Sequence, residues 1–508
     1  MKNGFVYLVG AGPGDPGLIT VRGKECLSLA DVVVYDYLAS EQLLEFAHPE
    51  AELIYAGKIG GRHNHEQWQI NDLLVEKALS GKVVTRLKGG DPFIFGRGGE
   101  ECEALVSAGI HFEIVPGVTA GIGAAAYAGI PLTHRHVTTS VAFVTGHENP
   151  EKESSEIDWE RLSLGSGTIV FYMGVKNLPH ITSSLMEHGR SPETPVALVR
   201  WGTRPEQQIL TGTLADISKL ARRAAFKAPA ITIVGEVVKL REKLRWFDSR
   251  PLFGKGILVT RAADQAGDFS RLLSSKGASI LECPTIKLVR PESWGELDAE
   301  IDRLSTFDWS IFTSANAVSF FFDRITAKGL DCRAFGSCRI CAVGPKTAAL
   351  LAAKGIKADM VPVDYKAEGV VTEFGKIDLQ GRKVLFPRAD KARELIPQAL
   401  GEMGAIVTAP IAYRNIVPDA LPQNVLQALE EQRVHCVTFT SSSTVDNFAA
   451  MLGENRMFRL LQGVKIAAIG PVTAGSCRDL GLKVDMEPDK YTLENMTEEI
   501  VKFFTKFP

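Results

Sequence analysis

The sequence predicts an α/β protein that consists of several lobes in two halves. Short apolar stretches alternate with stretches whose apolar residues recur at helical spacing, which is typical of α/β domains. The chain has 508 residues, which is too long for a single hydrophobic core. In the second half, a set of motifs returns about 127 residues later, which indicates two lobes of similar build.

Composition excludes several classes of protein. Charged residues make up 23% and apolar residues 45% of the chain, with a formal net charge of −3. This balance provides no basic field, so we expect no nucleic-acid partner. No apolar run reaches the roughly 18 residues of a membrane span, and the first residues enter a strand with no signal peptide. We therefore expect a cytoplasmic protein.

The eight cysteines are scattered, and only Cys338 and Cys341 form a C-x-x-C pair. No second pair stands at zinc-ribbon spacing. We expect the cysteines to be buried free thiols and predict no metal site. A metal or redox role for the C-x-x-C pair is the alternative.

The first predicted strand, Phe5 to Val9, leads into the loop GAGPGDPG. This loop begins like the dinucleotide fingerprint, but Asp15 stands where the third glycine should be. Pro13 and Pro16 also remove two amide donors that a pyrophosphate would need. We therefore expect a poor nicotinamide site.

The next predicted strand, VVVYD, ends at Asp36. Three interpretations remain open for this carboxylate: a ribose ligand, a catalytic base, or a solvated residue at the end of a strand.

The loop from Gly57 to His65 follows a short strand and carries Lys58 and Arg62. A cationic, glycine-rich loop suits an anionic substrate, although a solvated basic loop is the alternative. Ile70, with later apolar residues at helical spacing, then predicts a helix that ends at Gly81.

The segment RLKGGDPFIFGRGGEE, residues 86–101, connects a predicted strand to a predicted helix. Ligands bind at such loops in open α/β sheets, and glycines allow the backbone to approach them closely. Asp91 can accept hydrogen bonds from hydroxyls or an amine, and Phe93 to Phe95 offer an apolar wall. A nucleoside-like ligand is the hypothesis, and a turn without a ligand is the alternative.

A small-residue helix is predicted from Gly121 to Gly129, after a strand that ends at Val115. We place a boundary at Pro131, so that residues 1–131 form one α/β lobe and residues 132–248 form a second, with a short linker at 249–253.

The first half resembles uroporphyrinogen-III C-methyltransferase. The resemblance rests on the motifs VYLVGAGPGDPGLIT, VVVYD, RLKGGDPFIFGRGGEE, VPGVTA, AGIPLTHR, VTGH, FYMG and ALVRWGT, in this order. It implies a two-lobed class III tetrapyrrole methyltransferase fold and S-adenosylmethionine as methyl donor, with S-adenosylhomocysteine as product. One departure is Ile59, where relatives often carry a second basic residue.

The resemblance also implies roles for individual residues. Asp36 matches the proposed proton acceptor and Lys58 the proposed proton donor. The cations that suit a substrate with eight carboxylates include Arg62, Arg97 and Arg135. The implied cofactor contacts are Pro13, Gly89, Gly90, Asp91, Ile94, Thr119, Ala120, Met173 and Gly202.

The second half contains an internal repeat. Phe312-Thr313-Ser314 returns as Phe439-Thr440-Ser441, and the motif AVGPKTA returns as AIGPVTA. Each copy predicts a strand, a short polar loop and a helix whose N-terminus can bind a carboxylate. For any one Thr-Ser pair, a helix N-cap is the alternative. Four such loops favour an acidic ligand.

This half resembles uroporphyrinogen-III synthase through VTRAADQAGDFSRLLSSKGA, IFTSANAV, AVGPKTA, VPVDYKAEG, LFPRADKARELIP, IAYRN, VTFTSSSTV and AIGPVTA. The resemblance implies two lobes that are not sequential, 254–287 with 416–508, and 288–415. Tyr413 matches a tyrosine proposed to assist loss of a hydroxyl, and packing near the hinge is the alternative. The implied substrate contacts are Ser314, Thr440, Ser441 and Ser442.

Together, the two resemblances predict a bifunctional enzyme. The C-terminal half would cyclise hydroxymethylbilane to uroporphyrinogen III with loss of water. The N-terminal half would add two methyl groups to give precorrin-2, on the way to siroheme or cobalamin. The alternatives are a methyltransferase with a non-catalytic, tetrapyrrole-binding C-terminal half, and a methyltransferase of a later corrin precursor. We expect a homodimer through the methyltransferase half.

Overall fold

The computed structural model describes residues 4–57, 66–146, 157–261 and 263–506. Contacts divide the chain into two compact units. One unit contains Met1–Gly256, Leu272–Ser279 and Val501–Pro508, and the other contains Ile257–Arg271 and Ile280–Ile500.

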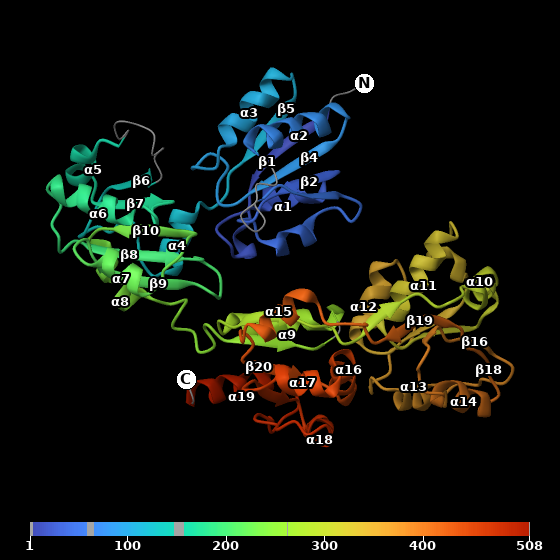
Figure 1. Cartoon of the computed structure of the whole chain (residues 1–508). Coiled ribbons are helices and arrows are strands. Elements are labelled where there is room, and N and C mark those ends of the chain that lie inside the picture. Colours follow the sequence, from blue (N-terminus) through green and yellow to red (C-terminus); the bar gives the residue numbers. More distant parts are fainter. Residues whose placement is uncertain (1–3, 58–65, 147–156, 262, 507–508) are drawn as a thin grey trace. The chain divides into compact units, whose positions relative to one another are not determined.

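The first sheet is parallel, with strand order β3-β2-β4-β1-β5. Val32 and Val34 pack with helices α2 and α3 on one face, whereas Val33 packs with α1 on the other. This alternation follows from the two-residue period of a strand, and burial on both faces explains the nearly continuous apolar strands. Figure 1 shows the helices around this sheet. Its elements are β1 (Phe5–Gly10), α1 (Val21–Ser28), β2 (Val32–Tyr35), β3 (Glu52–Tyr55), α2 (Gln67–Leu79), β4 (Val83–Lys88), α3 (Gly98–Ser107) and β5 (His111–Val115).

The second sheet is mixed, with strand order β6-β7-β10-β8-β9. Strand β10 is antiparallel to both β7 and β8. One of its strands, β9, was not predicted from the sequence; it is an edge strand that contains Gly212. The elements are β6 (Val141–Thr145), α5 (Trp159–Gly165), β7 (Thr168–Tyr172), α6 (Leu178–Glu187), β8 (Pro195–Arg200), β9 (Gln208–Thr213), α7 (Ile217–Arg223), β10 (Ala230–Val234) and α8 (Arg241–Leu244).

Helix α4 (Ala120–Tyr127) precedes the second sheet in the chain but packs on it. Ala124, Ala125 and Ala128 share a buried cluster with Val170 and Val199. The small side chains of α4 therefore allow close approach to the second sheet, which links the two lobes of the first unit.

The second unit contains two similar parallel sheets and a short connecting ladder. The strand orders are β12-β11-β20-β21 and β15-β14-β16-β18, and the connecting ladder is β13-β19-β17. Chain segments from both ends of the unit thus share the first of these sheets. The strands are β11 (Gly256–Val259), β12 (Ser279–Glu282), β13 (Lys287–Val289), β14 (Trp309–Phe312), β15 (Arg339–Ala342), β16 (Lys383–Leu385), β17 (Arg388–Ala389), β18 (Ile406–Thr408), β19 (Ile411–Ile416), β20 (Cys436–Phe439) and β21 (Lys465–Ala468).

The internal repeat is confirmed at the level of elements. Strand β14 leads into α11 as β20 leads into α16, and β15 leads into α12 as β21 leads into α18. Isolated parallel bridges join Cys341 to Met360 and, in the second copy, Ala467 to Met486. The helices are α9 (Ala263–Ser275), α10 (Gly295–Asp302), α11 (Ala315–Ala327), α12 (Pro345–Ala353), α13 (Ala367–Phe374), α14 (Leu395–Glu402), α15 (Gln423–Glu430), α16 (Ser442–Leu452), α17 (Glu454–Leu460), α18 (Pro471–Asp479) and α19 (Leu493–Lys506).

Candidate functional site

Three loops converge at the carboxyl ends of β1, β4 and β5. Gly12 and Gly90 form an antiparallel bridge, with their two N–H···O distances at 3.2 and 2.8 Å. A Cβ atom on Gly117 would lie 2.3 Å from the carbonyl oxygen of Gly90 and 2.7 Å from Cα of Gly10. Glycine is therefore required where these loops meet, because a side chain would push them apart.

Asp91 has a structural task within this junction. Its Oδ1 accepts a hydrogen bond from the amide of Phe93 at 2.8 Å, and its Oδ2 accepts one from the amide of Gly117 at 3.0 Å. The sequence predicted Asp91 as an acceptor for a ligand. A carboxylate has about four acceptor sites, so two amides leave capacity for a ligand hydroxyl or amine.

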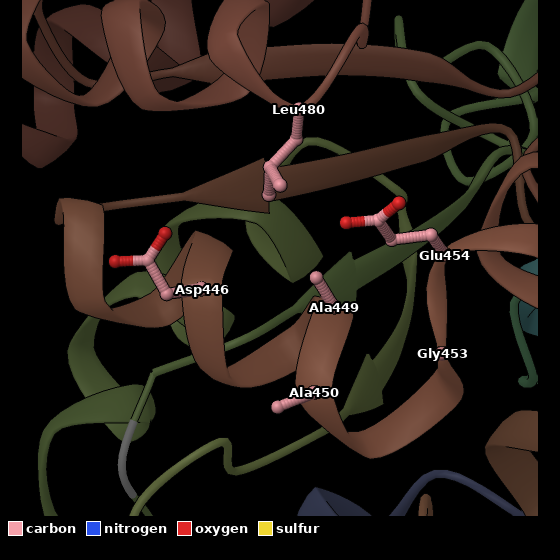
Figure 2. A pocket seen from close by; sticks show the side chains of 6 residues that line it. All are labelled: Asp446, Ala449, Ala450, Gly453, Glu454 and Leu480. Carbon is pink, nitrogen blue, oxygen red and sulfur yellow. The ribbon is translucent and has the colours of Figure 1, made fainter.

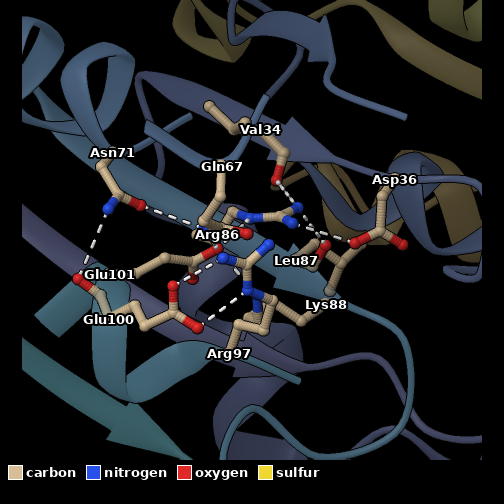
Figure 3. Close-up of polar contacts among 10 residues, drawn as sticks. All are labelled: Val34, Asp36, Gln67, Asn71, Arg86, Leu87, Lys88, Arg97, Glu100 and Glu101. Atoms are coloured by element: carbon tan, nitrogen blue, oxygen red, sulfur yellow. Dashed lines mark hydrogen bonds and ion pairs between the residues drawn. The ribbon is translucent and has the colours of Figure 1, made fainter. Parts of the chain in front are cut away.

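Asp36 follows β2 and is held in one orientation (Figure 3). Its Oδ2 accepts a hydrogen bond from Nη2 of Arg86 at 3.0 Å, and its Oδ1 accepts one from the amide of Leu38 at 3.1 Å. The Asp36 side chain is 23% exposed, whereas that of Arg86 is 4% exposed. Asp36 thus presents an oriented, partly accessible carboxylate at the end of its strand.

Arg86 and Lys88 are buried cations on β4, and both contact Glu101 of α3. Burial lowers the pKa of the Arg86 guanidinium, but the carboxylates of Asp36 and Glu101 outweigh this effect and raise it. Burial and the nearby Arg86 lower the pKa of the Lys88 ammonium. Sequence reasoning gave these three residues no role. The signal was present, because charged residues are unusual inside a central parallel strand.

Backbone strain gathers in the loops of the first unit. Seven non-glycine residues within the described segments have positive φ, and two of them, Ala225 and Gln432, directly follow the C-caps of helices. The others lie in loops after β4, β7 and β8. Such backbone costs about 1–3 kcal/mol per residue and concentrates at functional sites. The five loop residues with positive φ are Phe95 (φ 54°), Arg97 (60°), Met173 (55°), Trp201 (50°) and Thr203 (74°).

The predicted cofactor residues differ in exposure. Ile94 and Met173 are exposed apolar side chains, at 37% and 53% of their full accessible surface. Pro13, Gly89, Ala120 and Gly202 are half-buried, and Gly90 is buried. A Cβ atom on Gly89 would lie 2.4 Å from Cβ of Leu38, and one on Gly202 would lie 2.4 Å from Cβ of Ala124. These two glycines therefore also serve packing.

Thr119 joins the two lobes of the first unit. Its Oγ1 lies 2.8 Å from the phenol oxygen of Tyr172, which also accepts a hydrogen bond from the amide of Gly121 at 2.8 Å. The ring of Phe95 packs on that of Tyr172, with centroids 4.8 Å apart. Burial raises the pKa of the Tyr172 phenol, which therefore stays neutral and able to donate. Across the same pair of lobes, the amide of Asp15 donates to Oγ1 of Thr203 at 2.9 Å.

Of the cations predicted to bind substrate, the structure describes Arg97 and Arg135. Arg97 is exposed and forms a paired contact with Glu100, at 2.8 and 2.6 Å. This pair raises the pKa of Arg97, chiefly through the side-chain hydrogen bond to Glu100. Arg135 is exposed in a polar turn. Lys58 and Arg62 lie outside the described residues.

In the second unit, the two repeated serines are helix N-caps. Oγ of Ser314 accepts a hydrogen bond from the amide of Ala317 at 3.1 Å, and Oγ of Ser441 accepts one from the amide of Thr444 at 3.4 Å. The N-cap alternative is therefore what the structure contains at both serines. Thr440 and Ser442 flank Ser441 and are half-buried.

Tyr413 lies on β19, 8% exposed within the core around α11. Its ring stacks on Phe320 with centroids 5.5 Å apart and an interplanar angle of 18°. Its phenol oxygen lies 3.2 Å from Oγ of Ser314. The ring of Tyr413 is therefore packed in the core, and its polar end contacts a second predicted site residue.

A hollow of about 370 Å³ in the second unit is a poor site for the acidic ligand predicted there (Figure 2). Two carboxylates, those of Asp446 and Glu454, contribute to its wall, and like charges would repel an anionic ligand. The remaining lining is apolar or glycine: Ala449, Ala450, Gly453 and Leu480.

The described segments contain no group of three or more His, Cys, Asp or Glu residues that could hold a metal ion. All eight cysteines are free thiols, and seven of them are buried. None of the helices that the structure describes is both long and apolar enough to cross a membrane.

Comparison with known proteins separates the two halves. Residues 6–218 match the family of tetrapyrrole (corrin/porphyrin) methylases, and residues 267–498 match the family of uroporphyrinogen-III synthase HemD. The porphyrin biosynthesis protein HemD of Ruminiclostridium josui is 37% identical over 502 residues, which cover 99% of this chain and 98% of that protein.

Relatives of the first half alone are more similar. The uroporphyrinogen-III C-methyltransferase of Priestia megaterium is 54% identical over 46% of this chain and 98% of that protein. The S-adenosyl-L-methionine-dependent uroporphyrinogen III methyltransferase of Methanosarcina barkeri is 53% identical over 47% of this chain and 94% of that protein. The chain belongs to the family of bifunctional tetrapyrrole biosynthesis enzymes in which a tetrapyrrole methylase is joined to a uroporphyrinogen-III synthase.

Proposed function

We propose that the chain catalyses two consecutive reactions. The C-terminal half cyclises hydroxymethylbilane to uroporphyrinogen III with loss of water. The N-terminal half transfers two methyl groups from S-adenosylmethionine to uroporphyrinogen III, giving precorrin-2. The observation that carries this proposal is a relative that matches 99% of the chain, together with two separate family matches on its halves.

The residues of the first unit fit the cofactor. An adenosyl group needs apolar contacts and a few fixed polar partners. Ile94 and Met173 offer exposed apolar side chains, and Asp91 is held by two backbone amides with acceptor capacity to spare. The implied contacts would be Pro13, Gly89, Gly90, Asp91, Ile94, Thr119, Ala120, Met173 and Gly202.

S-adenosylmethionine, when bound, supplies a methyl group on a positively charged sulfur. The protein must orient the attacking pyrrole carbon toward it and exclude water. We assign Asp36 the stabilisation of the cationic pyrrole or acceptance of its proton, because its carboxylate is oriented by Arg86 and the Leu38 amide. Lys58 is assigned as proton donor. Arg62, Arg97 and Arg135 would bind substrate carboxylates.

In the second unit, we assign Tyr413 to assist departure of the substrate hydroxyl. The contact between its phenol oxygen and Ser314 supports this role, since a hydrogen bond can orient the phenol. Ser314, Thr440, Ser441 and Ser442 would contact substrate carboxylates. The N-cap role of the two repeated serines is compatible with this, because the helix N-terminus itself attracts anions.

The organisation of the chain is part of the proposal. The methyltransferase lobes would comprise residues 1–131 and 132–248, the linker 249–253, and the synthase lobes 254–287 with 416–508, and 288–415. We expect a cytoplasmic homodimer joined through the methyltransferase half, with no nucleic-acid partner.

A single assay tests both reactions. Purified chain receives freshly made hydroxymethylbilane and S-adenosylmethionine, and the oxidised products are identified by mass and isomer analysis. A doubly methylated type III product is expected. Unmethylated type I product would contradict synthase activity and favour a non-catalytic C-terminal half. Methylation at other positions would favour an enzyme acting on a later corrin precursor.

A further inference from the structure

Three buried charged side chains and the partly exposed Asp36 form one network at the ends of β2 and β4 (Figure 3). Oε1 of Glu101 accepts hydrogen bonds from Nζ of Lys88 at 2.7 Å and from Nε of Arg86 at 3.3 Å. On its other side, Arg86 donates to Asp36 at 3.0 Å. Arg86 therefore bridges the carboxylate of Glu101, inside the protein, and that of Asp36, at the surface of the proposed site.

The guanidinium of Arg86 is held almost completely. Its Nη1 donates to the carbonyl oxygen of Leu87 at 3.1 Å and to that of Val34 at 3.4 Å. Nε is used by Glu101, and Nη2 is used by Asp36. Because the guanidinium is a rigid plane, anchoring Nε and Nη1 also fixes the direction of Nη2.

Glu101 is costly in this position. It is 0% exposed, and its Oε2 has no hydrogen-bond partner within the described part of the chain. Arg86 and Lys88 are each 3% exposed. Buried ion networks seldom stabilise a fold more than apolar residues of the same volume would. A gain in stability therefore does not explain this buried network. The contact of Arg86 with Asp36 does, because it orients a residue of the proposed site.

We propose that Glu101 is a positioning residue of the methyltransferase site, which acts through Arg86 to hold the Asp36 carboxylate in its working orientation. Lys88 balances the second negative charge, so that the network contains two cations and two anions. This inference rests on the proposed role of Asp36. It goes further because Glu101 touches neither Asp36 nor the surface.

The first test replaces Glu101 by glutamine, which keeps the shape but removes the charge. For Glu101→Gln, we expect kcat for methylation to fall about 10-fold to 100-fold, as for a small misplacement of a reacting group. KM for uroporphyrinogen III and binding of S-adenosylhomocysteine, measured by calorimetry, should change less than about 2-fold. Glu103→Gln is the matched control, because Glu103 lies exposed on the same helix. Its kcat should equal that of the parent chain.

A double variant separates positioning from a general structural effect. If Glu101 acts through Asp36, then Asp36→Asn with Glu101→Gln should be no slower than Asp36→Asn alone, within about 2-fold. If kcat of the double variant falls by the product of the fold-decreases of the two single variants, the inference is overturned, while Asp36 remains catalytic. Full activity of Asp36→Asn would instead overturn the proposed role of Asp36, and the inference with it.

A second variant covers the case in which Glu101→Gln does not fold. Lys88→Met combined with Glu101→Gln removes one cation and one anion. The remaining charges of the network, those of Arg86 and Asp36, still balance each other. We expect this chain to fold and still show the lowered kcat, because Arg86 has lost its anionic anchor. A folded double variant with parental kcat would overturn the inference.

Discussion

The phenol oxygen of Tyr413 lies 3.2 Å from Oγ of Ser314, although the two residues are 99 positions apart in the chain. Tyr413 comes from β19 of the connecting ladder, and Ser314 caps helix α11. The contact therefore joins the connecting ladder to a repeated polar loop, and the resemblance to uroporphyrinogen-III synthase predicted both residues as parts of the synthase site.

We expect Tyr413→Phe to slow cyclisation of hydroxymethylbilane at least about 10-fold, because phenylalanine has no hydroxyl group to donate a proton or a hydrogen bond. The measurement is the initial rate of uroporphyrinogen III formation. Methylation of supplied uroporphyrinogen III by the same preparation should be unchanged, which controls for folding. A parental cyclisation rate would leave Tyr413 with its packing role against Phe320 alone.

Ser314→Ala and Ser441→Ala should each destabilise the second unit by about 1 kcal/mol, because each removes an N-cap hydrogen bond. Urea unfolding monitored by circular dichroism measures this loss. If the serines also bind substrate, KM for hydroxymethylbilane should rise in both variants. A rise in neither would restrict them to capping.

Asp36→Asn should lower kcat for methylation about 100-fold or more while the chain remains folded, because the amide keeps the shape but loses the charge and the basicity. The assay follows transfer of labelled methyl groups to uroporphyrinogen III. Cyclisation by the same sample provides the internal control. Undiminished methyl transfer would remove Asp36 from the catalytic residues.

Lys58→Ala should likewise slow methylation, by at least about 10-fold, without lowering the unfolding midpoint. Lys58 lies in the glycine-rich segment GKIGGR, and truncation to alanine removes its ammonium group. Steady-state kinetics decide between a rise in KM, which would indicate binding of a substrate carboxylate, and a fall in kcat, which fits a proton donor. No change in either parameter would contradict both roles.

The thiols give a test of burial that depends on pH. Desolvation by burial raises the pKa of Cys102 and Cys338 to about 11 and that of Cys283 and Cys341 to about 12. The folded state therefore prefers neutral thiols. Their contribution to stability is complete below the ordinary thiol pKa of about 8.5, and it is lost as pH rises toward 11–12.

Two measurements check this prediction. At pH 8, a thiol reagent should modify no cysteine of the folded chain rapidly except Cys332, which is half-buried, and all eight after unfolding. The urea midpoint should fall between about pH 9 and 11. Rapid modification of several thiols in the folded chain would contradict the buried positions.

Local patterns predicted much of the fold. Strands β1, β2 and β4 followed from short apolar runs, and α3 followed from the pattern after the glycine loop, because these signals depend only on neighbouring residues. The edge strand β9 did not follow, since its sequence QILTGT contains only two adjacent apolar residues and a glycine. The repeat in the second half was readable from spacing alone, and the matching strand–helix pairs agree with it.

The sequence by itself determined the two families, the repeat and the residue types at each strand end, because motifs and their order are properties of the chain. Only the tertiary structure decided that Asp91 is held by backbone amides from two loops and that Arg86 connects Glu101 to Asp36. Apart from the local contact of Asp91 with the Phe93 amide, those pairings join residues 15 to 50 positions apart. A hydrogen bond depends on positions within about 3 Å that only packing establishes.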